Sequence, residues 1–480
     1  MDKFSQLRHD NPVFIYKSYS FSQTDTEINA SFVFEIPGVA VFTPGWSFPK
    51  PQCNCPVIDN NLTLERLVFS LGMAELVSYW KAVCSPEIIV ECGCLDSAQI
   101  DWWKKLYFLG LGEFFYVNGI SAHMDSFVNI TCNGAFSCTD EVAVNNHGCL
   151  VPVGGGKDSA LTLETLVSNG VDCRCYAINK RCSISATVET AGLDEDALIV
   201  ASRRFDRSLV ELNNKGYLNG HTPFSAIVAF SAEITAYLHG LQYVVLSNEA
   251  SANESSVVGQ SVNHQYSKSF EFENDFHSYE INYLKSGVYY FSFLRPLSEF
   301  QIASMFVSHK KYLPVFRSCN LGSKVSPDIW CGDCPKCLFV CLILSPFVDL
   351  ETLSSVFGKN LLDDESMLDD FIGLLGLSEH KPFECVGSID EVKLSVSLAV
   401  RNLTADNRPL PLLFRYFVDK GLYNPDSLDG IYDSYRKYYN NDNLLPSKFE
   451  AILKNEMERL LWVLFLSFSA LLPRIKMFVF

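Results

Sequence analysis

The sequence predicts an α/β protein whose core is a parallel sheet, with an α+β region before the sheet and a helical region after it. From Leu150 onward, short apolar runs alternate with amphipathic helical patterns, which is the order of elements that builds a parallel sheet with covering helices. Residues 12–47 instead alternate apolar and polar side chains, and the patterns beyond residue 345 are helical. We therefore expect three domains, at residues 1–147, 148–345 and 346–480.

The first region combines strands and helices. Residues 13–16 and 30–34 alternate as strands do, and Pro and Gly mark turns near residues 37 and 44, so we expect a small antiparallel sheet. A helix, a strand and a second helix are then expected at 62–83, 88–90 and 97–109. The region contains no catalytic spacing, and we expect it to contribute to substrate recognition.

The expected parallel sheet begins with the apolar run 149–153. Leu161, Leu163 and Leu166 mark the inner face of the next helix, which Ser168-Asn169-Gly170 ends. Thr222 and Pro223 are typical of the N-cap and first position of a helix. Further strands are expected at 171–178 and 243–246. Such sheets bind ligands beyond the carboxyl ends of their strands, and residues 154–159 lie at one such end.

Composition limits the partners and the compartment. The net charge is −17 and the sequence pI is about 5.0, so long-range electrostatics oppose polyanions and we expect no nucleic-acid partner. Seventeen cysteines in a long chain that begins with no signal peptide fit a reducing cytoplasm better than a disulfide framework. The longest apolar stretch, 460–472, is shorter than the roughly twenty residues of a membrane helix, so we expect a buried helix and no membrane partner.

The segment Gly154-Gly155-Gly156-Lys157-Asp158-Ser159 follows an apolar run and opens a helical pattern. Backbone N–H groups of a Gly-rich turn and the positive end of the next helix together favour phosphate, so the segment predicts a phosphate cradle. It fits neither a Walker A loop nor a dinucleotide-binding fingerprint. A Gly-rich turn without a ligand remains an alternative, and Pro152 is unusual in a central strand because it donates no hydrogen bond to the sheet.

A second motif is a group of cysteines. Cys319, Cys331, Cys334 and Cys337 have spacings that suit one tetrahedral Zn²⁺, which prefers thiolate ligands. Cys341 allows the alternative of an iron–sulfur cluster, although Leu342 stands where a ferredoxin motif has Pro. Unmetallated core cysteines are the third possibility. The pairs with single-residue spacing, Cys53 and Cys55, Cys92 and Cys94, and Cys173 and Cys175, are expected to be buried on one side of a strand.

The Gly-rich segment resembles the PP-loop of ATP pyrophosphatases, Ser-Gly-Gly-x-Asp-Ser, at Gly155, Gly156, Asp158 and Ser159. Gly154 departs from the first Ser and removes one hydroxyl donor. The resemblance implies an adenine-nucleotide α-hydrolase-like sheet and cleavage of ATP to AMP and pyrophosphate. Together with the cysteines, the loop is also similar to 7-cyano-7-deazaguanine synthase, a much shorter zinc-containing PP-loop enzyme.

A longer resemblance, running nearly end to end, is to the MurL family of ATP-dependent UDP-N-acetylmuramoyl-L-alanyl-L-glutamate epimerases. It rests on the following segments: 78–82, 102–108, 154–159, 247–249, 263–273, 293–298, 316–320 and 381–385. The family activity implied is inversion of the terminal L-Glu of a peptidoglycan precursor, with ATP and Mg²⁺. An acyl-adenylate explains the need for ATP, because removing the α-proton beside a free carboxylate would create a second negative charge on that group.

This resemblance and the local chemistry assign expected roles. ATP is expected at Gly154, Gly155, Gly156, Lys157, Asp158, Ser159 and, by position alone, Asn179. Mg²⁺ is expected at Asp158, with Glu249 or Glu254 completing the shell. The alternative for Asp158 is a helix cap, and the alternative for the two glutamates is a solvated loop.

The run 263–273 mixes His, Tyr, Lys and Glu with aromatic residues, which favours substrate contact. His264, Tyr266 and Lys268 are the candidates for α-proton transfer, although a structural imidazole is the better explanation for His264 taken alone. Arg203, Arg204 and Arg317 are the candidates for substrate anions, with solvated surface as the alternative for the first two.

Two other functions stay open from the sequence. One is a PP-loop adenylating enzyme similar to 7-cyano-7-deazaguanine synthase, acting on a carboxylate with ammonia, or a tRNA-thiolating relative. The other is a nucleotide-sensing protein with a zinc-bound interaction module. The acidic balance and the large flanking regions argue against the first.

Overall fold

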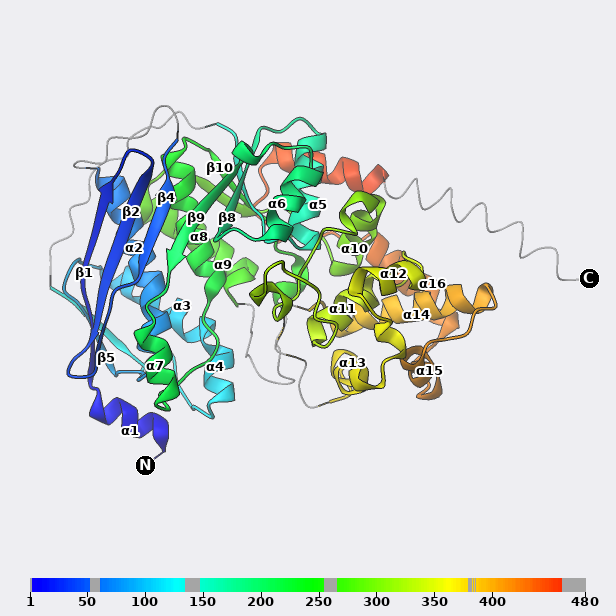
Figure 1. The fold of residues 1–480 in the computed structure, drawn as a ribbon, viewed down its shortest axis with the longest axis horizontal. Helices are drawn as coiled ribbons and strands as arrows, with labels where there is room; N and C mark the ends of the chain where they lie inside the picture. Colours follow the sequence, from blue (N-terminus) through cyan, green and yellow to red (C-terminus); the bar gives the residue numbers. More distant parts are fainter. Residues whose placement is uncertain are drawn as a thin grey trace, which may run out of the picture.

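A single mixed sheet organises the computed structural model, which describes residues 2–51, 61–133, 147–253, 266–378, 382, 384 and 386–459 (Figure 1). The eleven strands are β1 (Val13–Gln23), β2 (Glu27–Ile36), β3 (Ala40–Phe42), β4 (Gly45–Pro49), β5 (Glu87–Val90), β6 (Asn129–Cys132), β7 (Cys149–Pro152), β8 (Cys173–Ile178), β9 (Leu198–Arg204), β10 (Tyr243–Leu246) and β11 (Tyr289–Ser292). Their order is β11-β10-β7-β8-β9-β4-β2-β1-β5-β6, and β3 pairs with β2.

The part of the sheet that follows Leu150 is parallel, as its sequence pattern predicts. β11, β10, β7, β8 and β9 are neighbours in parallel register, for example Leu150 beside Val244 and Val151 beside Cys175. Leu150 packs into the core on one face and Val151 into the core on the other. Apolar residues in succession are required here because helices cover both faces. Pro152 is the last residue of β7, where its missing N–H group interrupts no further pairing of that strand.

The first strands do not form the separate small sheet that the sequence suggests. β1, β2, β3 and β4 are antiparallel, but β5 and β6 run parallel to β1, and β4 pairs antiparallel with β9 through Gly45 opposite Arg204. An unpaired strand edge exposes a row of N–H and C=O groups. Joining β4 to β9 satisfies both edges and makes one sheet of the two predicted ones.

Helices cover the faces of the sheet. On one face lie α2 (Leu62–Trp80) and α8 (Phe224–Leu238), whose side chains share a core with Phe32 and Trp46. On the other face of the parallel part lie α5 (Lys157–Ser168), α6 (Cys182–Thr190) and α10 (Glu299–Ser308). The remaining α-helices in the described part of the first 290 residues are α1 (Lys3–Asp10), α3 (Ser97–Gly110), α4 (Gly112–Val117), α7 (Ser208–Asn214) and α9 (Phe270–Tyr279).

Caps explain where several helices begin. The Asn61 side chain accepts from the N–H of Leu64 at the start of α2, and Asp96 forms a capping box with Gln99 at the start of α3. Thr222 is not the cap of α8, so that prediction is wrong: the helix begins at Phe224 with Pro223 before it. The Thr222 hydroxyl instead accepts a hydrogen bond from the Lys81 ammonium at 2.6 Å.

The chain beyond residue 345 is helical in its described part, as predicted, and one more helix, α11 (Pro335–Leu344), precedes it. Its helices are α12 (Leu350–Phe357), α13 (Leu368–Leu374), α14 (Ile389–Ala405), α15 (Leu412–Asp419), α16 (Pro425–Arg436) and a helical segment over 447–459. They gather on the side of the molecule opposite the N-terminal strands (Figure 1). None of the helices in the described ranges combines the length and apolar character needed to cross a membrane. The apolar run 460–472 lies outside the described residues.

Candidate functional site

The Gly-rich turn lies at the carboxyl end of β7 and is held by two other segments. Gly155 has φ +83°, and a Cβ there would lie 2.4 Å from Ser183 Oγ on α6. A Cβ on Gly156 would lie 2.6 Å from Ser318 Oγ, and the N–H of Arg317 donates to the carbonyl of Gly155 at 2.7 Å. Only glycine fits at 155, because the left-handed backbone and the close approach of α6 both exclude a side chain.

The turn leads directly into α5. Gly156 is the N-cap, and within the described part of the chain no side chain caps this end of the helix. The Ser159 hydroxyl donates to the Gly156 carbonyl at 3.2 Å. An α-helix leaves its first N–H groups without partners inside the helix, so an anion beside Gly156 would receive several donors together with the positive end of the helix.

A buried lysine and two carboxylates lie behind the turn. Lys157 is 1% exposed, and its ammonium contacts Asp158 Oδ1 and Glu299 Oε2. Burial by itself lowers the pKa of Lys157, but the charges of Asp158 and Glu299 outweigh it and raise the pKa, so the lysine is a cation. Burial raises the pKa of Glu299, with Lys157 opposing the shift and Asp158 and Glu249 adding to it. Glu299 therefore interacts with two cations, Lys157 and Lys336, and with the carboxylates of Asp158 and Glu249.

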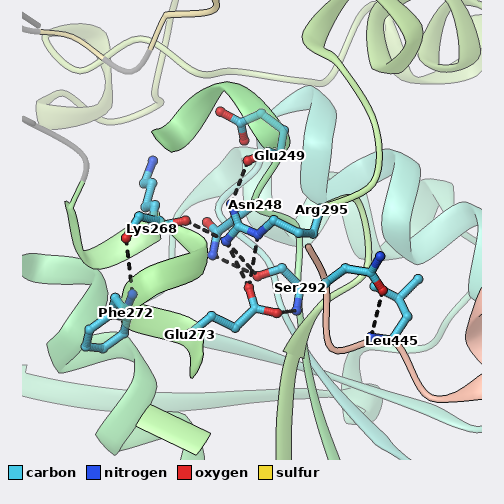
Figure 2. A network of polar contacts seen from close by, with 10 residues as sticks. Asn248, Glu249, Lys268, Phe272, Glu273, Ser292, Arg295 and Leu445 are labelled. Atoms are coloured by element: carbon cyan, nitrogen blue, oxygen red, sulfur yellow. Dashed lines mark hydrogen bonds and ion pairs between the residues drawn. The ribbon is translucent and has the colours of Figure 1, made fainter. Parts of the chain in front are cut away.

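Three predicted segments meet in one buried network (Figure 2). Arg295 is fully buried, and its guanidinium pairs with Glu273 at 2.9 Å. It also donates to the carbonyls of Glu249 and Lys268, each at 2.6 Å. Asn248 donates to Ser292 Oγ at 3.1 Å. Arg295 thus ties the loop after β10, the turn before α9 and the loop after β11 together, and the side chains of Glu249 and Lys268 point away from it (Figure 2).

The candidates for proton transfer have different surroundings. His264 and Glu254 lie outside the described residues. Tyr266 is only 4% exposed, its hydroxyl lies 3.5 Å from Asp275 Oδ2, and burial raises its pKa. Lys268 ends a short 3₁₀ turn that leads into α9. Their roles in catalysis stay predictions.

Asn179 follows β8 with φ +57°. Its Oδ1 accepts from the N–H of Arg203 at 3.1 Å, so the side chain links the ends of β8 and β9 at the same edge of the sheet as the Gly-rich turn. Contact with adenosine stays a prediction.

The predicted arginines fall into three environments. Arg203 makes a two-point ion pair with Glu75, at 2.6 and 2.7 Å, and Glu75 also accepts from Trp46 Nε1 at 2.8 Å. Arg204 lies on the opposite, exposed face of β9. Arg317 donates to the Phe316 carbonyl at 2.7 Å, and its buried Nε has no hydrogen-bond partner among the described residues. Binding of substrate by these three arginines stays a prediction. Arg203 differs from the other two because its guanidinium already forms an ion pair with a buried carboxylate.

The four cysteines of the predicted metal site come together. The Sγ atoms of Cys319, Cys331, Cys334 and Cys337 all lie within 4.8 Å of one another. Neighbouring sulfurs are 3.5 Å apart for Cys334 and Cys337, 3.6 Å for Cys331 and Cys337, and 3.9 Å for Cys319 and Cys334. A tetrahedron with Zn–S bonds of about 2.3 Å has edges of about 3.8 Å, so the set can hold such an ion.

Cys341 is buried in α11 and does not belong to this group, which removes the geometric basis for the ferredoxin alternative. The other cysteine pairs differ from one another. Cys173 and Cys175 are buried on one side of β8, as predicted. Cys94 is only half-buried, with its Sγ 3.6 Å from that of Cys132, and Cys92 is half-buried too. Cys53 and Cys55 lie outside the described residues.

The cysteine loop is attached to the Gly-rich turn. Besides the Arg317 to Gly155 bond, Asp328 Oδ1 accepts from the N–H of Ser183 at 3.0 Å, at the start of α6. The loop that carries the four thiols therefore braces both the turn and the helix that packs against it.

Comparison with known proteins gives the family. Residues 5–293 match the family model of the MurL N-terminal domain, and residues 315–413 match that of the MurL C-terminal domain. The chain belongs to the MurL family. The MurL N-terminal match includes both β4 and β9, and the C-terminal match includes all four clustered cysteines.

Three curated MurL relatives carry the name UDP-N-acetyl-alpha-D-muramoyl-L-alanyl-L-glutamate epimerase. The protein of Xanthomonas oryzae pv. oryzae (strain MAFF 311018) is 35% identical over 364 residues, which are 75% of this chain and 78% of the relative. The protein of Salinispora tropica is 35% identical over 398 residues, covering 82% of this chain and 86% of the relative. That of Micromonospora sp. (strain ATCC 39149) is 36% identical over 398 residues, covering 82% and 88%.

Sequence reasoning missed several residues of this site, above all Glu299. The spacing of Ser298 and Gln301 is a capping box that signals a helix start, and it puts Glu299 in the first turn of α10. No local pattern shows that Glu299 meets Lys157, which is 142 positions away. Ser183, Ser318 and Asp328 were missed for the same reason, because they act through contacts between distant segments.

Proposed function

We propose that this chain inverts the terminal L-Glu of UDP-N-acetylmuramoyl-L-alanyl-L-glutamate to D-Glu in peptidoglycan precursor synthesis, using ATP and releasing AMP and diphosphate. The names of the three relatives support the epimerisation and its substrate. The observation that carries the ATP requirement is the Gly-rich turn at the carboxyl end of β7, which leads into the uncapped end of α5. No observation favours the amidating alternative.

In the proposed first step, the α-carboxylate of the terminal glutamate attacks the α-phosphorus of ATP and diphosphate leaves. The N–H groups from Gly155 to Ser159 bind the diphosphate portion, and the ammonium of Lys157 lowers the cost of its charge. Glu299, in the first turn of α10, forms an ion pair with Lys157 and so keeps the ammonium group next to the Gly-rich turn. Mg²⁺ would be bound by Asp158 and Glu249, with Glu254 as a further candidate, and when bound it offsets the phosphate charge.

The mixed anhydride then makes the α-proton acidic enough to remove. Activation leaves the glutamyl carbonyl neutral, so its enolate carries one negative charge, which preorganised donors can stabilise. A base removes the α-proton, a proton returns on the opposite face, and water cleaves the anhydride to D-Glu and AMP. His264, Tyr266 and Lys268 stay the candidates for these transfers. Tyr266 fits the donor role better than that of base, because its pKa is raised.

We also propose that Cys319, Cys331, Cys334 and Cys337 hold a structural Zn²⁺. Four thiolates fill a tetrahedral shell and leave no position for substrate, so the ion would brace the loop and take no part in the reaction.

The proposal is tested by incubating the protein with ATP, Mg²⁺ and the UDP-muramoyl-L-Ala-L-Glu nucleotide in D₂O. AMP formation and deuterium at the glutamyl α-carbon are followed together. Both signals are expected with the wild-type chain, and Asp158→Ala should abolish both. Incorporation of deuterium at an undiminished rate without ATP would refute the adenylation step.

A further inference from the structure

A polar cavity of about 310 Å³ lies on the exposed face of the sheet, away from the Gly-rich turn. Four strands supply its floor, and seven of the ten lining residues are serine, asparagine or arginine. The lining consists of Ser20, Ser22, Asn29, Ala30, Ser31, Gly45, Trp46, Ser47, Ser202 and Arg204.

The strand register arranges the polar side chains of this cavity in two rows. One row runs Ser20, Ser31, Gly45, Arg204, and the other runs Ser22, Asn29, Ser47, Ser202. Ser20 and Ser31 are hydrogen-bonded at 2.9 Å, whereas the buried Oγ of Ser47 has no partner among the described residues. A buried hydroxyl without a partner costs free energy, so Ser47 marks a position where a ligand group would be stabilised.

Arg204 places a positive charge at the end of the first row. Its Nη2 would lie 2.9 Å from a Cβ on Gly45, so the guanidinium lies directly over the glycine backbone. Among the described residues, no carboxylate pairs with it, in contrast to Arg203 on the other face, which is held by Glu75. An accessible guanidinium beside a group of hydroxyls suits a sugar phosphate, because its planar fork binds two phosphate oxygens at once.

The cavity lies at a suitable distance from the Gly-rich turn. Arg204 ends β9 and Pro152 ends β7, so both lie at the carboxyl edge of the parallel strands. With about 4.8 Å between neighbouring strands, β9 lies about 10 Å from β7 and β4 about 14 Å from it. A dipeptide spans at most about 7 Å, and the lactyl group of a muramoyl peptide extends it further, so the sugar of such a substrate would fall over β9 and β4 when its glutamate is at the turn.

We propose that this cavity binds the sugar–diphosphate portion of the nucleotide-linked substrate. Arg204 pairs with the diphosphate, and the hydroxyls of Ser31, Ser47 and Ser202 bond the hydroxyl and acetamide groups of the sugar. The inference rests on the proposed function, since it takes the substrate class from there, but it concerns a different part of the molecule. A volume of this size suits one sugar with its phosphates rather than the whole nucleotide.

The test measures binding of UDP-N-acetylmuramic acid, which lacks the dipeptide, by calorimetry with the full chain and no ATP. Arg204→Gln should weaken binding about tenfold or more, since a hydrogen bond to a charged group is lost. Ser20→Tyr should weaken it as well by filling the cavity. Ser20 is exposed on a strand, where tyrosine is well tolerated, so this variant separates loss of the site from loss of the fold.

Arg174→Gln is the matched control. Arg174 is an exposed arginine on the neighbouring strand β8, and it lines a different cavity, beside Asp172 and His239. It should bind the ligand as the wild type does. The proposal is overturned if Arg204→Gln and Ser20→Tyr bind as tightly as wild type, or if Arg174→Gln is the variant that weakens binding. Because the assay needs no epimerisation, failure of the proposed reaction would leave this result readable by itself.

Discussion

The three glycines of the turn have different surroundings, and the difference shows what each position needs. A Cβ on Gly154 would meet nothing within 4 Å, and its backbone is not left-handed. Gly155 has a positive φ, and a Cβ added there would also contact Ser183 on α6. Gly156 does not have a positive φ, but a Cβ added there would contact Ser318. The sequence shows three equal glycines, whereas the fold requires glycine most strictly at the middle one.

Gly155→Ala should therefore destabilise the protein, and Gly154→Ala should not. The left-handed backbone alone costs an alanine about 1–2 kcal/mol, and the 2.4 Å approach to Ser183 Oγ adds to it. The urea midpoint for unfolding, measured for both variants, is the readout. Equal midpoints for the two variants would contradict the geometry of the turn.

Two carboxyl groups are buried side by side far from the turn. The Ser286 hydroxyl lies 2.5 Å from Glu233 Oε1 and 2.8 Å from Glu280 Oε1, and Glu233 is fully buried in α8. Burial and the neighbouring Glu280 raise the pKa of Glu233 well above its usual value. We therefore expect Glu233 to be the carboxyl group of the pair that keeps its proton.

This pair makes stability fall as pH rises. Below the pKa of glutamate in the unfolded chain, about 4.5, Glu233 is protonated in both the folded and the unfolded state. Above that pH, Glu233 ionises in the unfolded chain but keeps its proton in the folded chain. The free energy of unfolding therefore falls by up to about 1.4 kcal/mol per pH unit until the pKa of the folded state is reached. Glu233→Gln removes that loss. Urea unfolding at pH 5 and pH 8 should show a gain for the variant at pH 8 that shrinks at pH 5. Glu271→Gln, which changes a glutamate on the surface, is the control and should have the stability of the wild type at both pH values. If Glu233→Gln also has the same pH dependence as the wild type, Glu233 is already ionised in the folded protein.

α11 and the loop before it carry the four clustered cysteines. Pro335 begins the helix, three of the clustered cysteines lie within or just before its first turn, and Cys341 lies one turn further on, facing the apolar core. The sequence spacing alone left zinc and iron–sulfur arrangements open, because both use Cys331, Cys334 and Cys337. The loop geometry brings Cys319 into the group and leaves Cys341 out, which is compatible with the proposed zinc and does not match the ferredoxin set.

Cys334→Ala should lose the metal, and Cys341→Ala should keep it. Metal analysis of the purified chains is expected to give about one zinc per wild-type and per Cys341→Ala molecule, and almost none for Cys334→Ala. Cys334→Ala should also unfold at lower urea concentration, since the loop holds Gly155 and Ser183. Retention of iron with visible absorption, lost on replacing Cys341, would support the ferredoxin arrangement instead.

Sequence patterns predicted local structure well and long-range pairing poorly. The helices at 62–83 and 97–109 and the parallel strands after Leu150 were found because their period and caps are local signals. The β4–β9 joint left no such signal, because antiparallel pairing of residues as far apart as Gly45 and Arg204 depends on which edges remain open. Thr222 failed as a cap for a related reason, since a distant lysine occupies its hydroxyl. At the site, the turn and the cysteines were predictable from their motifs, whereas Glu299 and the serine-lined cavity arise from segments that meet only after folding.

The continuous sheet makes a prediction about how the protein unfolds. Trp46 on β4, Glu75 on α2 and Arg203 on β9 form one hydrogen-bonded group across the joint, and Glu75 is 0% exposed. Arg203→Met leaves the Glu75 carboxylate buried without its cation, which typically costs about 3–5 kcal/mol. Lys180→Met, which breaks the exposed pair with Glu195, should cost far less, because solvent screens that pair.

Urea unfolding followed by tryptophan fluorescence and by far-ultraviolet circular dichroism measures this. Arg203→Met should lower the urea concentration at which the first unfolding transition occurs, and both probes should report the same decrease. The reason is that the strands on the two sides of the joint share one sheet and one core. Adding Glu75→Gln to Arg203→Met should recover part of the loss, since the double variant no longer buries an unpaired charge. The ion pair is not required if Arg203→Met shifts the midpoint no more than Lys180→Met does, or if the double variant is no more stable than the sum of the two single changes predicts. In that case backbone pairing and apolar packing alone hold the two parts of the sheet together.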